Sequence, residues 1–346
     1  MSRQLASSPR AAFALSLVEA LRARFVGRLE TASTAAGVTP GFRPVEWLRD
    51  DGRHGGGVRV ANEGDALFDR ASVNVSQVHY DDQPERRLGS ATAISAIVHP
   101  KNPRAPSIHV HVSWTEMRDG SAYWRVMADL NPALVNAGDK EHFERALRRA
   151  ATDTYPYGRE QGERYFYIPA LGRHRGVAHY YLEGWRTDDA AADAELARTV
   201  GEAAIDAYGE ILLEARTRST TGEDLSVQLA YHTLYFFQVL TLDRGTSAGL
   251  LVHDQNDVGI LGSLPSHVDR ALLNAWRRQV PAPQGELVEA LLGALPEEAP
   301  APVDVDQKRA LAAALRDHYR RYPHALELQA AGDIKPPTVQ NHLGLR

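Results

Sequence analysis

The chain has 346 residues, of which 43% are hydrophobic and 24% are charged, a composition typical of a globular protein that buries a sizeable core. The net charge of -5 and the pI near 6.3 argue against a nucleic-acid partner, because phosphate binding favours a basic surface. The absence of cysteine excludes disulfides and thiolate chemistry. We therefore expect one soluble, cytoplasmic domain over residues 1–346, without a membrane span.

The first predicted element is a helix between Arg10 and Thr31. Its apolar residues recur every four positions, which is the spacing of a helix with one buried stripe: Leu17, Leu21, Phe25 and Leu29. A Gly- and Pro-rich passage follows around residues 40–57. Within it, the run DGRHGGGVRV at residues 51–60 lacks the GxxxxGK pattern of a phosphate loop. This glycine-rich run predicts a flexible loop or a loop that covers a substrate.

The next predicted elements are strands, because apolar and polar residues alternate. The clearest covers residues 107–114. One of its faces is apolar and the other carries Ser107, His109, His111 and Ser113. A second strand at residues 122–129 places four side chains together on one face: Tyr123, Arg125, Met127 and Asp129. We also predict strands at residues 91–98, 176–182 and 229–242.

The connections between the early strands are short, which predicts antiparallel pairing. The fold class is therefore α+β, a large antiparallel sheet flanked by helices on both faces. Helices are predicted at residues 139–151, 187–217, 266–279 and 306–322, with Thr187 as the N-cap of the second. Residues 296–305 read as a short extended linker before the last helix, and residues 331–346 as an irregular tail.

Several polar residues are candidates for chemistry, although each also has a structural interpretation. His109 and His111 lie two apart on one strand face, where they could share a metal, meet a substrate or simply face solvent. Asp129 precedes Pro132 and could form a turn or act as a catalytic carboxylate. The DRGT sequence at residues 243–246 could be a capped turn with a local ion pair.

The order of these motifs resembles the oxygen-dependent coproporphyrinogen oxidase family, of which this chain would be a divergent member. The motifs lie within residues 52–265 and read FDRASVNVSQVH, HPKNPRAPSIHVHVSW, YWRVMADLNP, ERYFY, DRGT and ILGSLP. The resemblance implies a homodimer that converts coproporphyrinogen III to protoporphyrinogen IX. Two propionates become vinyl groups, O2 is the co-substrate, and no organic cofactor is required.

The resemblance also implies roles for particular residues. The catalytic set is His109, Asp129, Asp243 and Arg244, and the substrate-binding set is Ser95, His111, Ser113 and Arg125. In the family's proposed mechanism, a carboxylate such as Asp129 holds or deprotonates the pyrrole N–H, and His109 donates or shuttles a proton. No metal is expected, although His99, His109 and Glu144 match three positions sometimes assigned as metal ligands.

The chain departs from the family at the positions that bind anions. Ser113 stands where the family has an arginine, Arg125-Val126-Met127 replaces a glycine triplet, and residues 253–255 replace a later GGR sequence. Arg125 is the candidate that compensates for the lost charge. Two alternatives stay open: a re-purposed enzyme that oxidises a less anionic, electron-rich molecule, and a non-catalytic paralogue that binds a tetrapyrrole.

Overall fold

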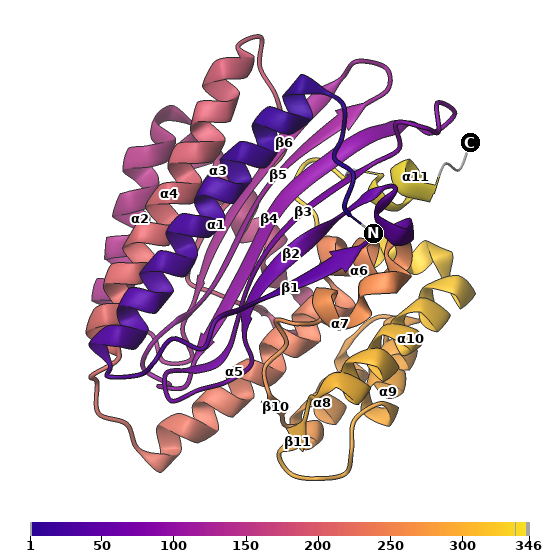
Figure 1. Ribbon diagram of the computed structural model, residues 1–346. Helices are drawn as coiled ribbons and strands as arrows, with labels where there is room; N and C mark the ends of the chain where they lie inside the picture. The colour runs from indigo at the N-terminus through magenta and orange to yellow at the C-terminus, as the bar shows by residue number, and fades with distance from the viewer. Residues whose placement is uncertain (1, 336, 344–346) are drawn as a thin grey trace.

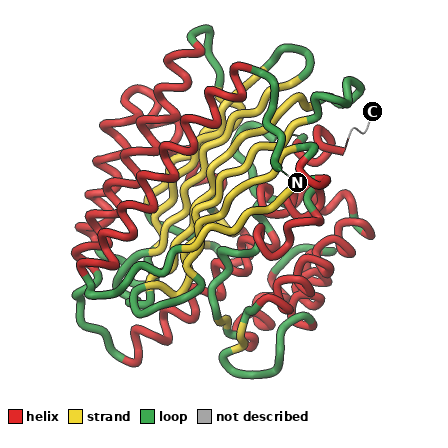
Figure 2. The backbone as a smooth tube through the Cα atoms, in the orientation of Figure 1, coloured by secondary structure: helices red, strands yellow, loops and turns green. Residues whose placement is uncertain are grey.

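A seven-stranded antiparallel sheet forms the centre of the molecule (Figures 1 and 2). The computed structural model describes residues 2–335 and 337–343. The strand order is β1-β2-β3-β4-β5-β6-β9, and every neighbouring pair is antiparallel. Its strands are β1 (Arg43–Leu48), β2 (Gly55–Asn62), β3 (Phe68–His79), β4 (Leu88–Pro100), β5 (Ser107–Met117), β6 (Ala122–Asn131) and β9 (Ala178–Trp185). The predicted α+β class is confirmed.

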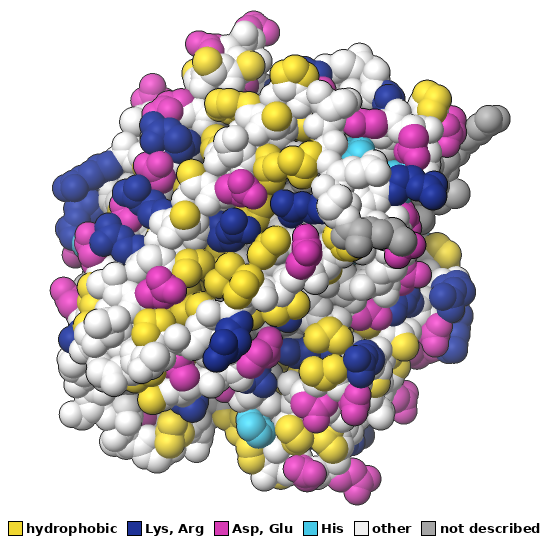
Figure 3. Space-filling view, viewed as in Figure 1, with side chains coloured by type: hydrophobic (Ala, Val, Ile, Leu, Met, Phe, Trp, Pro, Cys, Tyr) yellow, Lys and Arg dark blue, Asp and Glu magenta, His cyan; other side chains and the backbone are white. Residues whose placement is uncertain are grey.

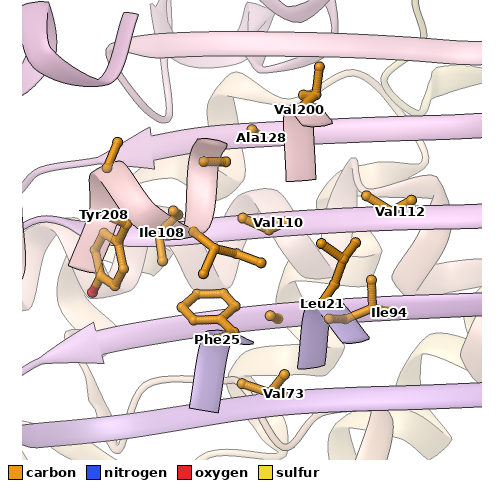
Figure 4. Close-up of a cluster of buried hydrophobic side chains, with 14 of the residues drawn as sticks. Leu21, Phe25, Val73, Ile94, Ile108, Val110, Val112, Ala128, Val200 and Tyr208 are labelled. Carbon is orange, nitrogen blue, oxygen red and sulfur yellow. The ribbon is translucent and has the colours of Figure 1, made fainter. Parts of the chain in front are cut away.

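Helices α1 (Pro9–Ala35), α2 (Ala137–Ala151) and α4 (Ala190–Ala215) cover one side of the sheet, and α3 (Tyr155–Tyr165) packs on edge strand β9. The apolar faces of β5 and α1 meet there, as their periodicities predict. Figure 4 shows Phe25 and Leu21 of α1 packed among Val110, Val112 and Tyr208. Each such buried side chain contributes roughly 1.5–3 kcal/mol. This core leaves the opposite, polar face of the sheet for the site.

In the described chain seven helices follow α4, and some of them lie against the polar face of the sheet (Figure 1). They are α5 (Gly222–Thr241), α6 (Arg244–Val252), α7 (Asp257–Ile260), α8 (Arg270–Trp276), α9 (Gln284–Gly293), α10 (Val305–Arg321) and α11 (Thr338–Leu343). Two small ribbons complete the described chain, β7 (Tyr167–Ile168) with β8 (Arg173–His174), and β10 (His267–Val268) with β11 (Ala301–Pro302). A second apolar core lies among these helices.

The strand predicted at residues 229–242 is wrong, because this segment belongs to helix α5. A capping box between Thr221 and Asp224 starts the helix. Nearly every residue from Tyr231 to Thr241 is buried. A helix that is buried on all sides has no amphipathic period, so its Tyr-, Phe- and Val-rich sequence is easily mistaken for a buried strand.

Other predictions also differ from the structure. Residues 55–60 of the Gly-rich run expected to form a loop belong to strand β2, and residues 301–302 of the expected linker form a short strand. Asp189, not Thr187, caps α4, and the Thr187 hydroxyl donates to Asp193 instead. The helix predicted from residue 266 begins at Arg270, where Asp269 is the N-cap, and ends at Trp276. The predicted irregular tail contains helix α11, while residues 336 and 344–346 lie outside the described chain.

The surface in Figure 3 carries acidic and basic side chains that are interspersed, as expected from the small net charge of -5. None of the helices in the described ranges is long and apolar enough to cross a membrane.

Candidate active site

The candidate side chains lie in rows across the strands on the polar face of the sheet, because residues paired between antiparallel strands point to the same face. Ser113 pairs with Arg125, and His109 pairs with Asp129. Asn74 of β3, Ser95 of β4 and His111 of β5 are successive partners across three strands. The period-two reading of β5 and β6 is thus confirmed.

Two adjoining cavities, of about 230 and 170 Å³, lie between this face and the helices that cover it. His111 and Arg125 line both cavities. The larger one also contacts Ser113, Tyr123 and Glu183 of the sheet, together with residues of α6, α7 and α11. The smaller one contacts Ser95, His109 and Asp243, and is closed by Tyr235 of α5. Six of the eight predicted catalytic and substrate-binding residues therefore line one enclosure.

Asp129 is not among the residues that line either cavity. Its fully buried carboxylate accepts hydrogen bonds from Arg175 Nε (2.9 Å) and Nη2 (2.6 Å) and from His179 Nδ1 (2.6 Å). Burial acts to raise the pKa of Asp129, but Arg175 and His179 outweigh it and lower this pKa to about 2. Asp129 is thus an ionised carboxylate beneath the site, with both oxygens engaged.

Arg175 also fixes the state of His109. Its Nη2 lies 3.2 Å from His109 Nδ1, and a guanidinium donates but does not accept, so Nδ1 is the unprotonated nitrogen. The proton of the neutral ring is then on Nε2. Burial and the charge of Arg175 lower the pKa of His109 to about 3. At neutral pH this imidazole is an uncharged N–H donor rather than an imidazolium acid.

Asp243 is the carboxylate that lines the smaller cavity. It is the N-cap of α6, where Oδ1 accepts from the Thr246 N–H (2.7 Å), and Oδ2 accepts from the Tyr165 hydroxyl (3.0 Å). Burial acts to raise the pKa of Asp243, but the charge of Arg125, the hydrogen bond from the Thr246 N–H and the charge of Arg175 lower it overall. Asp243 is therefore a helix cap, as the structural interpretation of DRGT predicts, and it also lines the enclosure. Arg244 does not line either cavity, and its guanidinium lies 3.5 Å from the Leu326 carbonyl.

Arg125 reaches both cavities but already has partners. Its Nε lies 3.2 Å from Glu183 Oε2, and its Nη2 donates to the Tyr165 hydroxyl at 3.0 Å. The guanidinium also lies over the Tyr165 and Tyr181 rings, at 5.5 and 5.4 Å. A substrate carboxylate that binds Arg125 therefore competes with Glu183.

The three residues considered for a metal do not come together. His99 is fully buried and its Nδ1 bonds the Ser107 hydroxyl at 2.8 Å, away from both cavities. Glu144 lies on α2, which packs against α4, and pairs with Lys140. Over residues 2–335 and 337–343, no three His, Asp or Glu side chains form a group that would hold a metal ion.

Sequence reasoning missed Arg175 and Glu183 as parts of the site. Arg175 is 46 positions from Asp129 in the chain and becomes its partner only because β9 pairs with β6. Gly176 permits this approach, since an added Cβ would lie 2.3 Å from Asp129 Oδ1. His179, Tyr181 and Glu183 alternate along β9, so extending the predicted strand beyond Leu182 would have found Glu183.

An enclosed polar cavity, lined by neutral histidines, a carboxylate and an arginine, defines this protein as an α+β sandwich equipped for acid–base chemistry on a bound small molecule. The family model described as coproporphyrinogen III oxidase matches residues 14–293. The chain belongs to the coproporphyrinogen III oxidase family.

The relatives in this family are similar to the chain at modest identity. The mitochondrial oxygen-dependent coproporphyrinogen-III oxidase of Rattus norvegicus is 30% identical over 249 residues, which cover 65% of this chain and 56% of the rat protein. The oxygen-dependent coproporphyrinogen-III oxidase of Rickettsia akari is 29% identical over 241 residues, which cover 66% of this chain and 84% of that protein. The chain thus spans little more than half the length of its mammalian relatives.

The lowered pKa of His109 predicts a pH dependence of folding. An unfolded histidine binds a proton near pH 6.5, whereas native His109 does so only near pH 3. Between these values the unfolded state binds more protons, so stability falls as the pH falls. Lowering the pH from 7 to 5 should cost about 2 kcal/mol through His109 alone.

Urea unfolding at both pH values measures this effect. His109→Asn should reduce the pH-dependent loss of unfolding free energy by about 2 kcal/mol. An identical loss in wild-type protein and His109→Asn would contradict the assigned ionisation.

Proposed function

We propose that the protein catalyses O2-dependent oxidative decarboxylation of propionate side chains and converts coproporphyrinogen III to protoporphyrinogen IX without an organic cofactor. The observation that carries the proposal is the position of Asp243, a buried carboxylate that lines the smaller cavity together with the N–H donor His109. Membership of the family supports the same reaction, and so do the relatives, which are named oxygen-dependent coproporphyrinogen-III oxidases. We further propose a homodimer, as the family implies.

The reaction balances with O2 as the only oxidant. The side-chain carbon next to the pyrrole gives a hydrogen with its electron pair to O2, and one proton from the medium completes H2O2. The bond to the carboxylate breaks, CO2 leaves, and the released electron pair forms the vinyl double bond. Positive charge develops on the pyrrole during this step, so a carboxylate that accepts the pyrrole N–H stabilises it.

The site residues divide this work. Asp243 accepts the pyrrole N–H, since each of its oxygens keeps a lone pair beyond the bonds from Thr246 and Tyr165. His109 presents its Nε2–H to the smaller cavity. Asp129 positions Arg175, which sets the tautomer of His109. Ser95, His111 and Ser113 offer neutral hydrogen-bonding groups on the walls.

Incubation of purified protein with coproporphyrinogen III, in air and under strict anaerobiosis, tests the proposal. Protoporphyrin after oxidation of the product, with CO2 and H2O2 released in equal amounts, is expected only in air and without added flavin, haem or nicotinamide. Turnover under strict anaerobiosis would contradict the proposed dependence on O2. Wild-type protein that neither binds nor converts coproporphyrinogen III would leave the re-purposed enzyme as the better account.

Asp243→Asn should lower kcat about a hundredfold or more, because the charge is lost while the shape is kept. Asparagine is also a good N-cap, so α6 should be preserved. Asp269→Asn is the matched control, since Asp269 caps α8 in the same way (3.0 Å to the Leu272 N–H) without lining a cavity. Equal kcat values for the two variants would remove Asp243 from the mechanism.

Because Arg125 pairs with Glu183, substitutions of these two residues should change KM in opposite directions. Arg125→Ala should raise the KM for coproporphyrinogen III at least about tenfold, because a charge-assisted bond to a propionate is lost. Glu183→Gln should lower KM, because it removes the carboxylate that competes for the guanidinium. Steady-state kinetics measure both. A KM unchanged by Arg125→Ala would show that propionate binds elsewhere.

A further inference from the structure

The sequence ERYFY at residues 163–167 contributes to the site through Tyr165, the last residue of α3. Helix α3 lies close against β9, because an added Cβ at Gly162 would be only 2.6 Å from the Cβ of His179. From this position the Tyr165 hydroxyl reaches Asp243 at the start of α6, although Tyr165 lines neither cavity. Tyr165 can therefore act on a bound ligand only through another residue.

The Tyr165 hydroxyl connects Arg125 to Asp243. Arg125 Nη2 donates to the hydroxyl oxygen (3.0 Å), and the hydroxyl donates to Asp243 Oδ2 (3.0 Å). The direction of both bonds is fixed, because a guanidinium does not accept and an ionised carboxylate does not donate. A hydroxyl that accepts from a cation is also a stronger donor to its own acceptor.

The surroundings of Tyr165 hold its ring and its proton in place. The side chain is fully buried, stacks on Tyr181 with 4.3 Å between ring centroids, and meets Phe166 edge-on at 5.1 Å. Burial and the charge of Asp243 raise the pKa of Tyr165 above its usual value. The hydroxyl therefore keeps its proton and remains a donor to Asp243.

We propose that Tyr165 is a positioning residue that holds Asp243 in the ionised state in which it accepts the pyrrole N–H. This inference rests on the proposed function and deepens it. A hydrogen bond to the charged form of a carboxyl group favours that form, and a protonated Asp243 would carry no charge to stabilise the oxidised ring. The guanidinium that binds propionate thus also acts, through Tyr165, on the carboxylate that accepts the N–H.

Other charged or titratable side chains face Asp243 from the sheet, from α5 and from the segment before β9. They are His109 and His111 of β5, Arg125 of β6, Tyr235 of α5, and Arg175. Burial lowers the pKa of both histidines, so they are neutral at pH 7. Tyr165→Phe keeps all of these groups and the shape of the ring, and it removes the hydroxyl alone.

Carbon-13 NMR of aspartate-labelled protein, titrated with pH in the absence of substrate, tests the link directly. The Asp243 carboxyl signal is assigned by its loss in Asp243→Asn. Tyr165→Phe should raise the pKa of Asp243 by at least about one pH unit, because a hydrogen bond to a charged group is lost. Tyr180→Phe is the matched control. Its buried hydroxyl bonds Thr154 (2.7 Å) within the core on the other side of the sheet, so the pKa of Asp243 should not change.

The dependence of kcat on pH, with coproporphyrinogen III as substrate, tests the consequence for turnover. In Tyr165→Phe the acidic limb should move to higher pH by the same amount, because Asp243 becomes protonated at higher pH. Tyr180→Phe should follow the wild-type profile. A loss of kcat that is equal at every pH would show a merely structural role for Tyr165 and overturn the inference.

The outcomes separate this inference from the proposed function. An Asp243 pKa that is the same in Tyr165→Phe and Tyr180→Phe would overturn the role of Tyr165 and leave the proposed function standing. A raised pKa in Tyr165→Phe, together with wild-type protein that does not convert coproporphyrinogen III, would overturn the proposed function while the control of Asp243 by Tyr165 stands. Circular dichroism of both variants establishes that they are folded.

Discussion

The site depends on one buried ion pair, Arg175 with Asp129. A charge moved out of water is strongly destabilised unless it is paired and hydrogen-bonded, and neither side chain has any exposed surface. The guanidinium meets this demand with two bonds to Asp129 and one to Gln238 Oε1 of α5 (2.7 Å), and it also contacts His109. These partners come from β6, β5 and α5, so the ion pair connects the sheet side of the cavity to helix α5. Removing either partner would leave a buried charge uncompensated, at a cost of about 3–5 kcal/mol.

This pair gives the two aspartates of the site different tasks. Arg175 and His179 make three hydrogen bonds to Asp129, which lines neither cavity, whereas Asp243 lies on the wall of the smaller cavity as the cap of α6. The carboxylate that faces the ligand is therefore the one that the helix terminus orients. His109 is neutral between them because burial and Arg175 disfavour its charged form. The resulting enclosure combines an N–H acceptor with an N–H donor, as the proposed oxidation of a pyrrole substrate requires.

Local periodicity predicted the parts of the site that lie within one strand. The alternation in β5 and β6 placed His109, His111, Ser113, Arg125 and Asp129 on one face before any pairing was known, and the register confirms that arrangement. What could not be predicted depends on contacts between distant segments. Arg175 and Glu183 reach the site only because β9 lies beside β6, and α11 lines the larger cavity only because the C-terminal segment returns to the sheet. Helix α5 was misread because burial on every side removes the amphipathic period.

The state of His109 tests most directly the claim that Arg175 organises the site. Nitrogen-15 NMR of histidine-labelled protein at pH 7, with the His109 signal assigned by its loss in His109→Asn, reports which ring nitrogen carries hydrogen. We predict a neutral ring protonated on Nε2, with Nδ1 accepting from Arg175. A doubly protonated ring, or a neutral ring with hydrogen on Nδ1, would contradict the arrangement from which the roles of Asp129, Asp243 and His109 follow.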